Sequence, residues 1–224
     1  MDTPTSPVET AFARRLAHPS QDTEPLVATD YGELDDRKLA GLAARGREPA
    51  FRELLRRYER PVFSLVYRMV GDRTLAEDLA QEAFVRAFNA ISSYKPSYKF
   101  SNWILKIANN HTIDYLRKKK LDTVSIDGSP HASTDEEVGR SRLDLPADDE
   151  SPHEYVENRE LGGQIEEAIG SLREEYRTAI LLRHVEGYAY DEIAEIMEVP
   201  LGTVKTYIHR ARGELKDRLA YLQP

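Results

Sequence analysis

The sequence predicts an all-α protein built from two small helical domains joined by a flexible acidic linker. Apolar residues recur at helical spacing through most of residues 36–120 and again from residue 159 onward. No long stretch shows the apolar–polar alternation of a half-buried strand. The segment between the two helical stretches is acidic, contains prolines and has too few apolar residues to offset the entropy of ordering.

Four segments follow from this pattern. Residues 1–35 mix Pro, Thr, Ser and acidic residues, so we expect a disordered N-terminal tail, apart from a possible short helix near Ala11 to Ala17. Residues 36–120 form the first module, residues 121–158 the acidic linker and residues 159–224 the second module. We also expect capping boxes at Thr74–Glu77 and Ser171–Glu174, each opening a helix.

Composition narrows the class of protein. The chain has 224 residues, 40% of them hydrophobic, which suits two modest cores better than one large core. The absence of cysteine excludes disulfides, thiol catalysis and the common cysteine-bearing zinc sites. No signal segment and no apolar run of about 20 residues is present, so we expect a cytoplasmic protein without membrane insertion.

Charge is partitioned along the chain, although the net charge is −8. Residues 38–120 carry 17 basic and 8 acidic residues, whereas residues 121–158 carry 2 and 11. A basic block therefore faces an acidic tethered segment. We hypothesise that the linker competes with DNA for the first module, and that neutralising its Asp and Glu residues raises the DNA affinity of the free protein.

Two short helices joined by a tight turn are predicted between Glu192 and Arg212. Val204, Ile208 and Ala211 form the buried stripe of the second helix. Its other face mixes hydroxyl, aromatic and basic side chains, which suits a helix-turn-helix that reads duplex DNA, although a solvated surface helix has a similar composition. The candidate duplex-binding residues are Arg183, Thr203, Lys205, Thr206, Tyr207, His209, Arg210 and Arg212.

A second candidate surface interleaves aromatic residues and lysines just before the helix that starts near Ile104. Aromatic rings stack on unpaired bases and lysines follow phosphates, so this segment suits single-stranded nucleic acid. For Phe100 and Trp103 the alternative is a role in the core. The candidate strand-binding residues are Tyr94, Lys95, Tyr98, Lys99, Phe100, Ser101, Trp103, Lys106, Asn109, Asn110, Arg117 and Lys118.

A third candidate surface is polar and acidic. Asp78, Gln81 and Glu82 share one face of the helix that follows Thr74, because they are three and four residues apart. They suit a basic partner surface, although a solvated helix face has the same pattern. The six histidines show no metal-ligand spacing, and no phosphate loop or nucleophile motif appears, so we expect no catalytic residue, no metal and no cofactor.

The sequence resembles bacterial RNA polymerase sigma factors of the extracytoplasmic-function (ECF) group in the sigma-70 family. The motifs are Asp78–Phe84 and Phe100–Arg117, similar to region 2, and Glu186–Gly187, Glu192–Ala194 and Gly202–Arg212, similar to region 4. The departures are local: Glu198 stands where a turn glycine is usual, Ala189 where a serine would cap the helix, and Arg173 where a proline often follows the capping serine. Asn109 and Tyr207 stand where arginine is common.

The resemblance implies a non-catalytic initiation factor that binds core RNA polymerase, selects promoters and helps to melt them. It implies docking of Asp78, Gln81 and Glu82 on the β′ clamp, contact with the β subunit, capture of the upstream melted strand by the first module, and reading of the distal duplex element by the second. It also implies an anti-sigma factor as a partner. The alternative is a stand-alone helix-turn-helix regulator, which would not co-elute with core polymerase.

Overall fold

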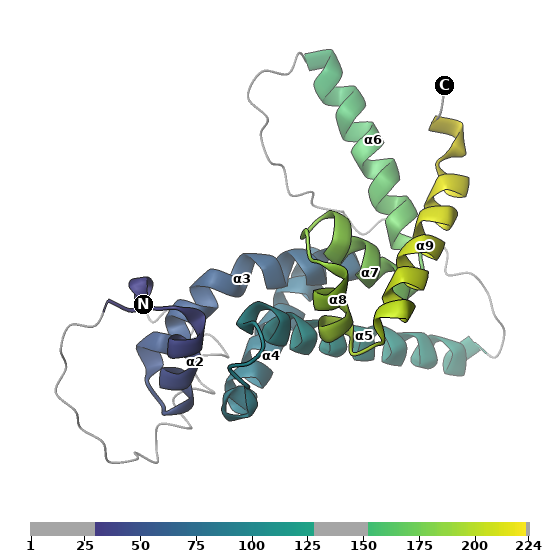
Figure 1. Ribbon diagram of the computed structural model, residues 1–224. Helices are drawn as coiled ribbons and strands as arrows, with labels where there is room; N and C mark the ends of the chain where they lie inside the picture. The colour runs from purple at the N-terminus through teal and green to yellow at the C-terminus, as the bar shows by residue number, and fades with distance from the viewer. Residues whose placement is uncertain (1–29, 128–151, 223–224) are drawn as a thin grey trace, which may run out of the picture.

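The computed structural model describes residues 30–127 and 152–222, with side chains for residues 30–121 and 161–221. These residues form α-helices and short 3-10 helices, and none of them lies in a strand, as the sequence predicts. Figure 1 shows the helices in chain order. Their bounds are η1 Tyr31–Glu33, α2 Asp36–Ala44, α3 Glu48–Val70, α4 Arg73–Ala90, η2 Ile91–Ser93, α5 Phe100–Asp127, α6 Pro152–Gly170, α7 Glu174–His184, α8 Tyr190–Met197, α9 Leu201–Arg218 and η3 Ala220–Leu222.

The first module packs α2, α3, α4 and the front half of α5 around one core. One side of α4 is buried in this core, through Leu79, Ala83, Ala87 and Phe88. Leu79, Ala83 and Ala87 follow one another at intervals of four residues and Phe88 adjoins Ala87, so all four lie on one side of the helix. This packing fixes the outward face of α4, which carries the third candidate surface.

The turn between α3 and α4 corrects one predicted cap. Gly71 adopts a left-handed conformation (φ 76°), which a glycine reaches without steric cost, and its N–H bonds to the Tyr67 carbonyl. The chain therefore re-enters a helix at Arg73, and the Asp72 carboxylate accepts a hydrogen bond from Leu75 N at 3.0 Å. The cap is Asp72 and not Thr74, because the preceding glycine ends α3 earlier than the capping-box pattern assumes.

The predicted cap at Ser171 is also wrong. α6 runs on to Gly170, and the Ser171 hydroxyl donates to the Ala168 carbonyl at 2.7 Å. α7 instead begins at Glu174, with Arg173 at the cap position and no side-chain cap. The reason is that Ser171 lies in the last turn of the preceding helix, where a hydroxyl bonds backward to a free carbonyl.

The second module contains the helix-turn-helix of α8 and α9, packed on α7. Ala189 caps α8 without a side-chain acceptor, while Glu192 supplies the return half of a capping box by accepting from Ala189 N at 2.9 Å. Glu198 ends α8 with φ 55°, and within the described ranges it is the non-glycine residue with positive φ. The turn therefore has the backbone that glycine would favour.

The predicted segment boundaries shift at three places. Residues 30–35, assigned to the tail, belong to the folded part, because Arg57 donates to the Gly32 carbonyl at 2.7 Å and Asp35 caps α2. α5 continues to Asp127 and α6 begins at Pro152, so both ends of the predicted linker are helical. Proline is favoured in a first turn because it lacks the N–H that would be unsatisfied there. The possible helix at Ala11–Ala17 and most of the linker lie outside the described residues.

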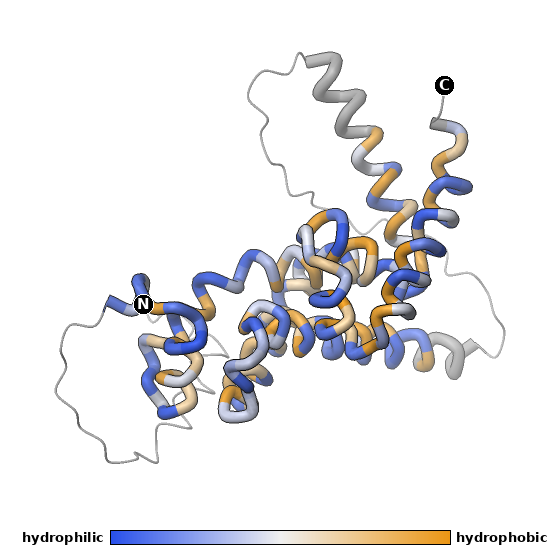
Figure 2. The backbone as a smooth tube through the Cα atoms, viewed as in Figure 1, coloured by the Kyte–Doolittle hydropathy of each residue, from blue (hydrophilic) through white to orange (hydrophobic). Residues whose placement is uncertain are grey.

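The two modules pack against each other. α8 lies across α5, and α7 lies against α3 (Figure 1). Their buried apolar residues form one continuous cluster, and the orange segments of Figure 2 meet where α3, α5, α7 and α8 converge. None of the helices in the described part of the chain is both long and apolar enough to cross a membrane.

Candidate nucleic-acid interface

The aromatic rings before α5 divide into a buried set and an exposed set. Phe100 is 3% exposed and lies with its ring centroid 5.2 Å from Tyr58, 5.3 Å from Tyr94 and 5.3 Å from Trp103. For Phe100 the core role is therefore the correct alternative. Tyr94 is 9% exposed, and its hydroxyl donates to the Tyr98 carbonyl at 2.8 Å, which fixes the loop.

The exposed ring is that of Tyr98, which together with Lys99 lines a pocket of about 420 Å³. Tyr98 is half exposed, and the Lys95 and Lys99 side chains are exposed beside it. The start of α2 supplies the opposite wall through Asp35, Asp36 and Arg37. A cavity of this size, with aromatic walls and polar groups at its rim, has the dimensions of a small-molecule or nucleobase site. The α2 wall was missed from the sequence, because nothing local relates residues 35–37 to the loop.

Side chains of α5 that are predicted to bind single-stranded DNA, together with the preceding Lys99, bond to the second module and form what we call the covered face, although Lys99 and Asn110 stay exposed to solvent. Lys99 Nζ lies 2.6 Å from Glu192 Oε1, and Lys106 Nζ lies 2.7 Å from Glu198 Oε1. Asn110 Nδ2 donates to the other Glu198 oxygen at 3.1 Å. Side chains that the sequence assigns to DNA are thus bonded to carboxylates of α8.

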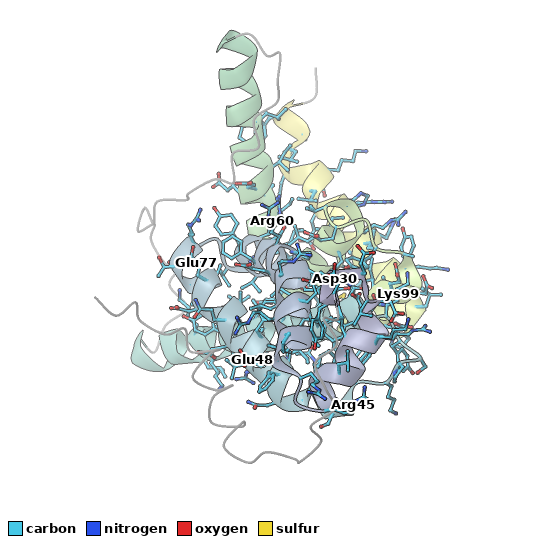
Figure 3. The ribbon with its side chains drawn as sticks, turned by 90° about the vertical axis from the view of Figure 1, so that its left-hand side faces the viewer. Asp30, Arg45, Glu48, Arg60, Glu77 and Lys99 are labelled. Carbon is cyan, nitrogen blue, oxygen red and sulfur yellow. The ribbon has the colours of Figure 1, made fainter. Side chains whose placement is uncertain are left out.

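Further along α5, contacts with the second module are fewer. Arg117 Nη2 lies 3.3 Å from Glu175 of α7, and Lys118 is exposed. Trp103 and Ser101 are half-buried. Figure 3 shows Lys99 at the right-hand edge of the molecule, beside the yellow-green ribbons of the second module.

Asn109 is buried and does not reach the surface in this arrangement. It is 1% exposed, and its side-chain oxygen accepts a hydrogen bond from the Thr178 hydroxyl of α7 at 3.1 Å. The same hydroxyl lies 3.2 Å from the Met69 sulfur. Contact between Asn109 and DNA, as predicted from the sequence, therefore requires that α7 move away from α5.

Ion pairing shifts the titration of the covered face. The hydrogen bond to Lys99 holds the pKa of Glu192 below its ordinary value, and the bond to Lys106 does the same for the pKa of Glu198. The Glu192 bond in turn raises the pKa of Lys99. All of these groups are charged at neutral pH, so the contacts are charge-assisted.

The α9 face predicted to read duplex DNA is open. Val204, Ile208 and Ala211 are buried as the stripe predicts. Lys205, Thr206, His209, Arg210 and Arg212 are exposed, whereas Arg183, Thr203 and Tyr207 are half-buried.

Neighbouring side chains orient several of these groups. Arg210 donates to the Tyr176 hydroxyl at 3.1 Å, and Arg212 Nη2 lies 3.0 Å from His184 Nε2. Arg183 donates to the Tyr188 carbonyl at 3.0 Å and its guanidinium lies 5.1 Å from the Tyr190 ring centroid. Basic groups of α9 are thus held at the surface by α7.

The acidic patch of α4 is also exposed. Asp78, Gln81 and Glu82 project from the face opposite the core, and Glu82 Oε2 lies 3.0 Å from His111 Nε2. Burial, reinforced by Arg86, lowers the pKa of His111, so this imidazole is neutral at pH 7. Figure 3 places Glu77 of α4 and Lys99 at opposite edges of the molecule.

Sequence reasoning missed the carboxylate row of α8, formed by Glu192, Glu195 and Glu198. Glu195 accepts from Asn102 Nδ2 at 2.8 Å, and the other two bind Lys99, Lys106 and Asn110. The available signal was their spacing of three residues, which places three carboxylates along one side of a short helix. It does not reveal which partner that side faces.

The described residues thus form two helical modules, one with a helix-turn-helix and one with a pocket beside a lysine-bearing helix. Residues 54–121 match the family description Sigma-70 region 2, and residues 162–215 match Sigma-70, region 4. The ECF RNA polymerase sigma factor SigW of Bacillus subtilis is 38% identical over 180 residues, covering 78% of this chain and 91% of that protein. The ECF RNA polymerase sigma-E factor of Escherichia coli K12 is 33% identical over 189 residues, covering 84% and 95%.

The chain belongs to the ECF group of the sigma-70 family. Solved structures agree in fold at 22% identity. The sigma factor RpoE of Bartonella quintana, in complex with the anti-sigma factor NepR, gives a TM-score of 0.59 and covers 76% of this chain and 96% of that one. CnrH, in complex with the cytosolic domain of CnrY, gives 0.57 and covers 83% and 97%.

Proposed function

We propose that this chain binds core RNA polymerase and directs it to promoters, with α9 reading a duplex element and the first module holding the melted strand. The observation that carries the proposal is the pairing of two different nucleic-acid surfaces in one chain. One is a helix with donors along an exposed face, and the other is a base-sized pocket beside a cationic helix.

The duplex element is read by α9. Its exposed Lys205, Thr206, His209 and Arg210 span about two helical turns, which is the length that a recognition helix places along base edges in the major groove. Arg212 and Arg183, at the margin of that face, suit phosphate contacts that fix the register.

The melted strand is held by the loop and α5. Lys95, Lys99, Lys106 and Lys118 supply phosphate contacts, and Tyr98 supplies an exposed ring for stacking. The pocket beside Tyr98 accommodates an extruded base, whose lost stacking of a few kcal/mol is offset by the new contacts.

Core polymerase binds the α4 patch. Carboxylates and an amide at Asp78, Gln81 and Glu82 complement basic residues of the β′ clamp. The reaction itself belongs to the polymerase. A further partner is an anti-sigma factor, because the structure of the similar sigma factor RpoE was solved in complex with one.

The stand-alone regulator accounts for α9 but gives no role to the α4 patch or to the base-sized pocket. Run-off transcription with purified sigma-free core polymerase on a promoter library separates the two functions. We expect defined start sites with this chain and none without it. Absence of start-site selection would contradict the proposal.

The docking patch is tested with the double variant Asp78→Asn/Glu82→Gln and the neighbouring single variant Glu77→Gln. The first should weaken polymerase binding about tenfold, and the second should leave it unchanged.

A further inference from the structure

We propose that in the free chain the carboxylate row of α8 occupies the strand-binding face of α5, so that the second module inhibits strand binding by the first. The row is formed by Glu192, Glu195 and Glu198. This inference rests on the proposed function, because it takes the α5 face as the strand site. It adds a regulatory contact within the chain.

The row and the face match residue for residue. Glu192 binds Lys99, Glu195 binds Asn102, and Glu198 binds both Lys106 and Asn110. The donors advance along α5 in the same order as the acceptors advance along α8. The contacts therefore extend along both segments and are not confined to a single point, although α8 lies across α5 in Figure 1.

The contacts reproduce the chemistry of a nucleic-acid strand. A phosphate presents anionic oxygens to lysine ammonium groups and side-chain amides, and a carboxylate presents the same kind of acceptor. A donor bonded to α8 is not available to DNA. Strand binding and closure are thus mutually exclusive at Lys99, Lys106 and Asn110.

The backbone at Glu198 supports a role for this carboxylate. Its φ of 55° lies in the left-handed region, which disfavours a residue with a Cβ and suits glycine. The side chain at this position reaches two donors of α5, at 2.7 and 3.1 Å. Glycine would relax the turn and lose both contacts.

A buried seam holds the closed arrangement from behind. The Thr178 hydroxyl of α7 donates to Asn109 of α5, and Arg177 Nη1 donates to the Met69 carbonyl at the end of α3. On the far side, Ser64 of α3 donates to Glu186 at 2.8 Å. Opening exposes Asn109 together with the lysines, so one movement would free the strand-binding side chains as a set.

The closed form leaves α9 exposed, and this predicts an order of events. Lys205 and His209 are exposed, whereas Lys106 is half-buried and paired with Glu198, and Asn109 is buried. Duplex recognition can therefore precede opening, whereas strand capture must follow it. This contact differs from inhibition by the acidic linker, because its carboxylates lie on a folded helix of the second module.

The experiment compares two full-length variants with equal changes in charge. In Glu192→Gln/Glu195→Gln/Glu198→Gln the row is neutralised, and Gln at 192 keeps an acceptor for the α8 cap. In the control, Glu166→Gln/Glu167→Gln/Asp217→Asn, three exposed carboxylates elsewhere in the second module are neutralised. Because the chain has no cysteine, Ser92→Cys and Lys216→Cys introduce unique spin-label sites, one in each module.

Two readouts are taken without polymerase. Double electron–electron resonance measures the distance between the two spin labels. Fluorescence anisotropy measures binding of a pool of random single-stranded DNA of roughly 12 nucleotides. We expect the row variant to show longer distances and about tenfold tighter strand binding than the parent, because the competent state is more populated. The control variant should match the parent in distance and gain far less affinity.

Unchanged distances in the row variant, equal effects in both variants, or opening without a gain in strand affinity would each overturn the inference. Run-off transcription by the same proteins is scored separately. Loss of start-site selection in the unsubstituted chain would count against the proposed function, whereas the distance measurement reports closure whether or not polymerase is bound.

Discussion

The two DNA-facing helices, α9 and α5, differ in what covers them. α9 buries its apolar stripe against α7 inside its own module and leaves its polar face exposed. α5 buries its apolar side in the first module, and its polar face is occupied by carboxylates of the second. The comparison teaches that similar donor side chains can be presented or withheld, depending on whether the neighbouring module carries acceptors at the matching spacing.

The largest expected effect comes from the seam behind the covered face. Arg177 donates to the carbonyls of Met69, Ile169, Gly170 and Leu172, and so joins the ends of α3 and α6 to α7. We expect Arg177→Ala to lower the free energy of unfolding by about 3 kcal/mol, because it strands partly buried carbonyls. Urea denaturation measures this, with exposed Arg60→Ala as a control within about 0.5 kcal/mol of the parent. A decrease in the free energy of unfolding no larger than that of Arg60→Ala would contradict the role given to Arg177.

The open face of α9 is tested by duplex binding. Arg210→Ala and Lys205→Ala should each weaken binding of a duplex promoter fragment about tenfold, which corresponds to the loss of one base or phosphate contact. Lys216→Ala, at the far end of α9, is the control and should have a much smaller effect. Anisotropy titrations at fixed salt give the ratios. Equal losses for the three variants would show that α9 contributes only general positive charge.

Glu198 links the two regions, because it forms the turn before α9 and also bonds to Lys106 and Asn110 of α5. Glu198→Gly should stabilise the helix-turn-helix by about 1 kcal/mol through relief of the left-handed backbone, while strand binding to α5 also increases. Glu198→Asn tolerates the same backbone but has a shorter side chain, so it separates the two effects. Thermal unfolding and strand titrations measure them. Strand binding that stays at the parental level in Glu198→Gly would argue against contact with Lys106.

Acidification should loosen the covered face. The pKa values of Glu192 and Glu198 are lowered in the closed form, so their stabilisation is complete above the ordinary glutamate pKa of 4.5 and is lost as pH falls through the lowered values. Label distances should therefore be constant near neutral pH and lengthen below about pH 4.5. In the Glu192→Gln/Glu195→Gln/Glu198→Gln variant the label distance should not change over this pH range. If it still lengthens there, titratable groups other than these three glutamates cause the transition.

Much of the fold could be predicted from local pattern. The stripes of α4 and α9 and the unusual residue at Glu198 are readable, because helical periodicity and turn geometry depend on neighbours in sequence. The caps at Thr74 and Ser171 were wrong because other local elements, Gly71–Asp72 and the last turn of α6, took precedence. Capping patterns identify a helix start only when the preceding helix has already ended.

The site was less predictable, because its main feature is a contact between distant segments. Lys106 and Asn110 carry the right chemistry for DNA, and the sequence identifies them as donors. Nothing in the sequence states that Glu198, about 90 residues later, is their partner. Asn109 shows the same limit: its type suits a base edge, but packing against Thr178 places it in the interior. The roles assigned to the α4, α5 and α9 residues stay predictions.

Lysine acetylation of the free chain, followed by mass spectrometry, tests the contrast between the two faces within one molecule. Lys99 and Lys106 bond to carboxylates, and such a bond favours the protonated, unreactive ammonium, so these two lysines should react severalfold more slowly than exposed Lys205. In the triple glutamine variant the three rates should converge. Equal rates in the unsubstituted chain would contradict the account, because the α5 face would then be as open as the α9 face.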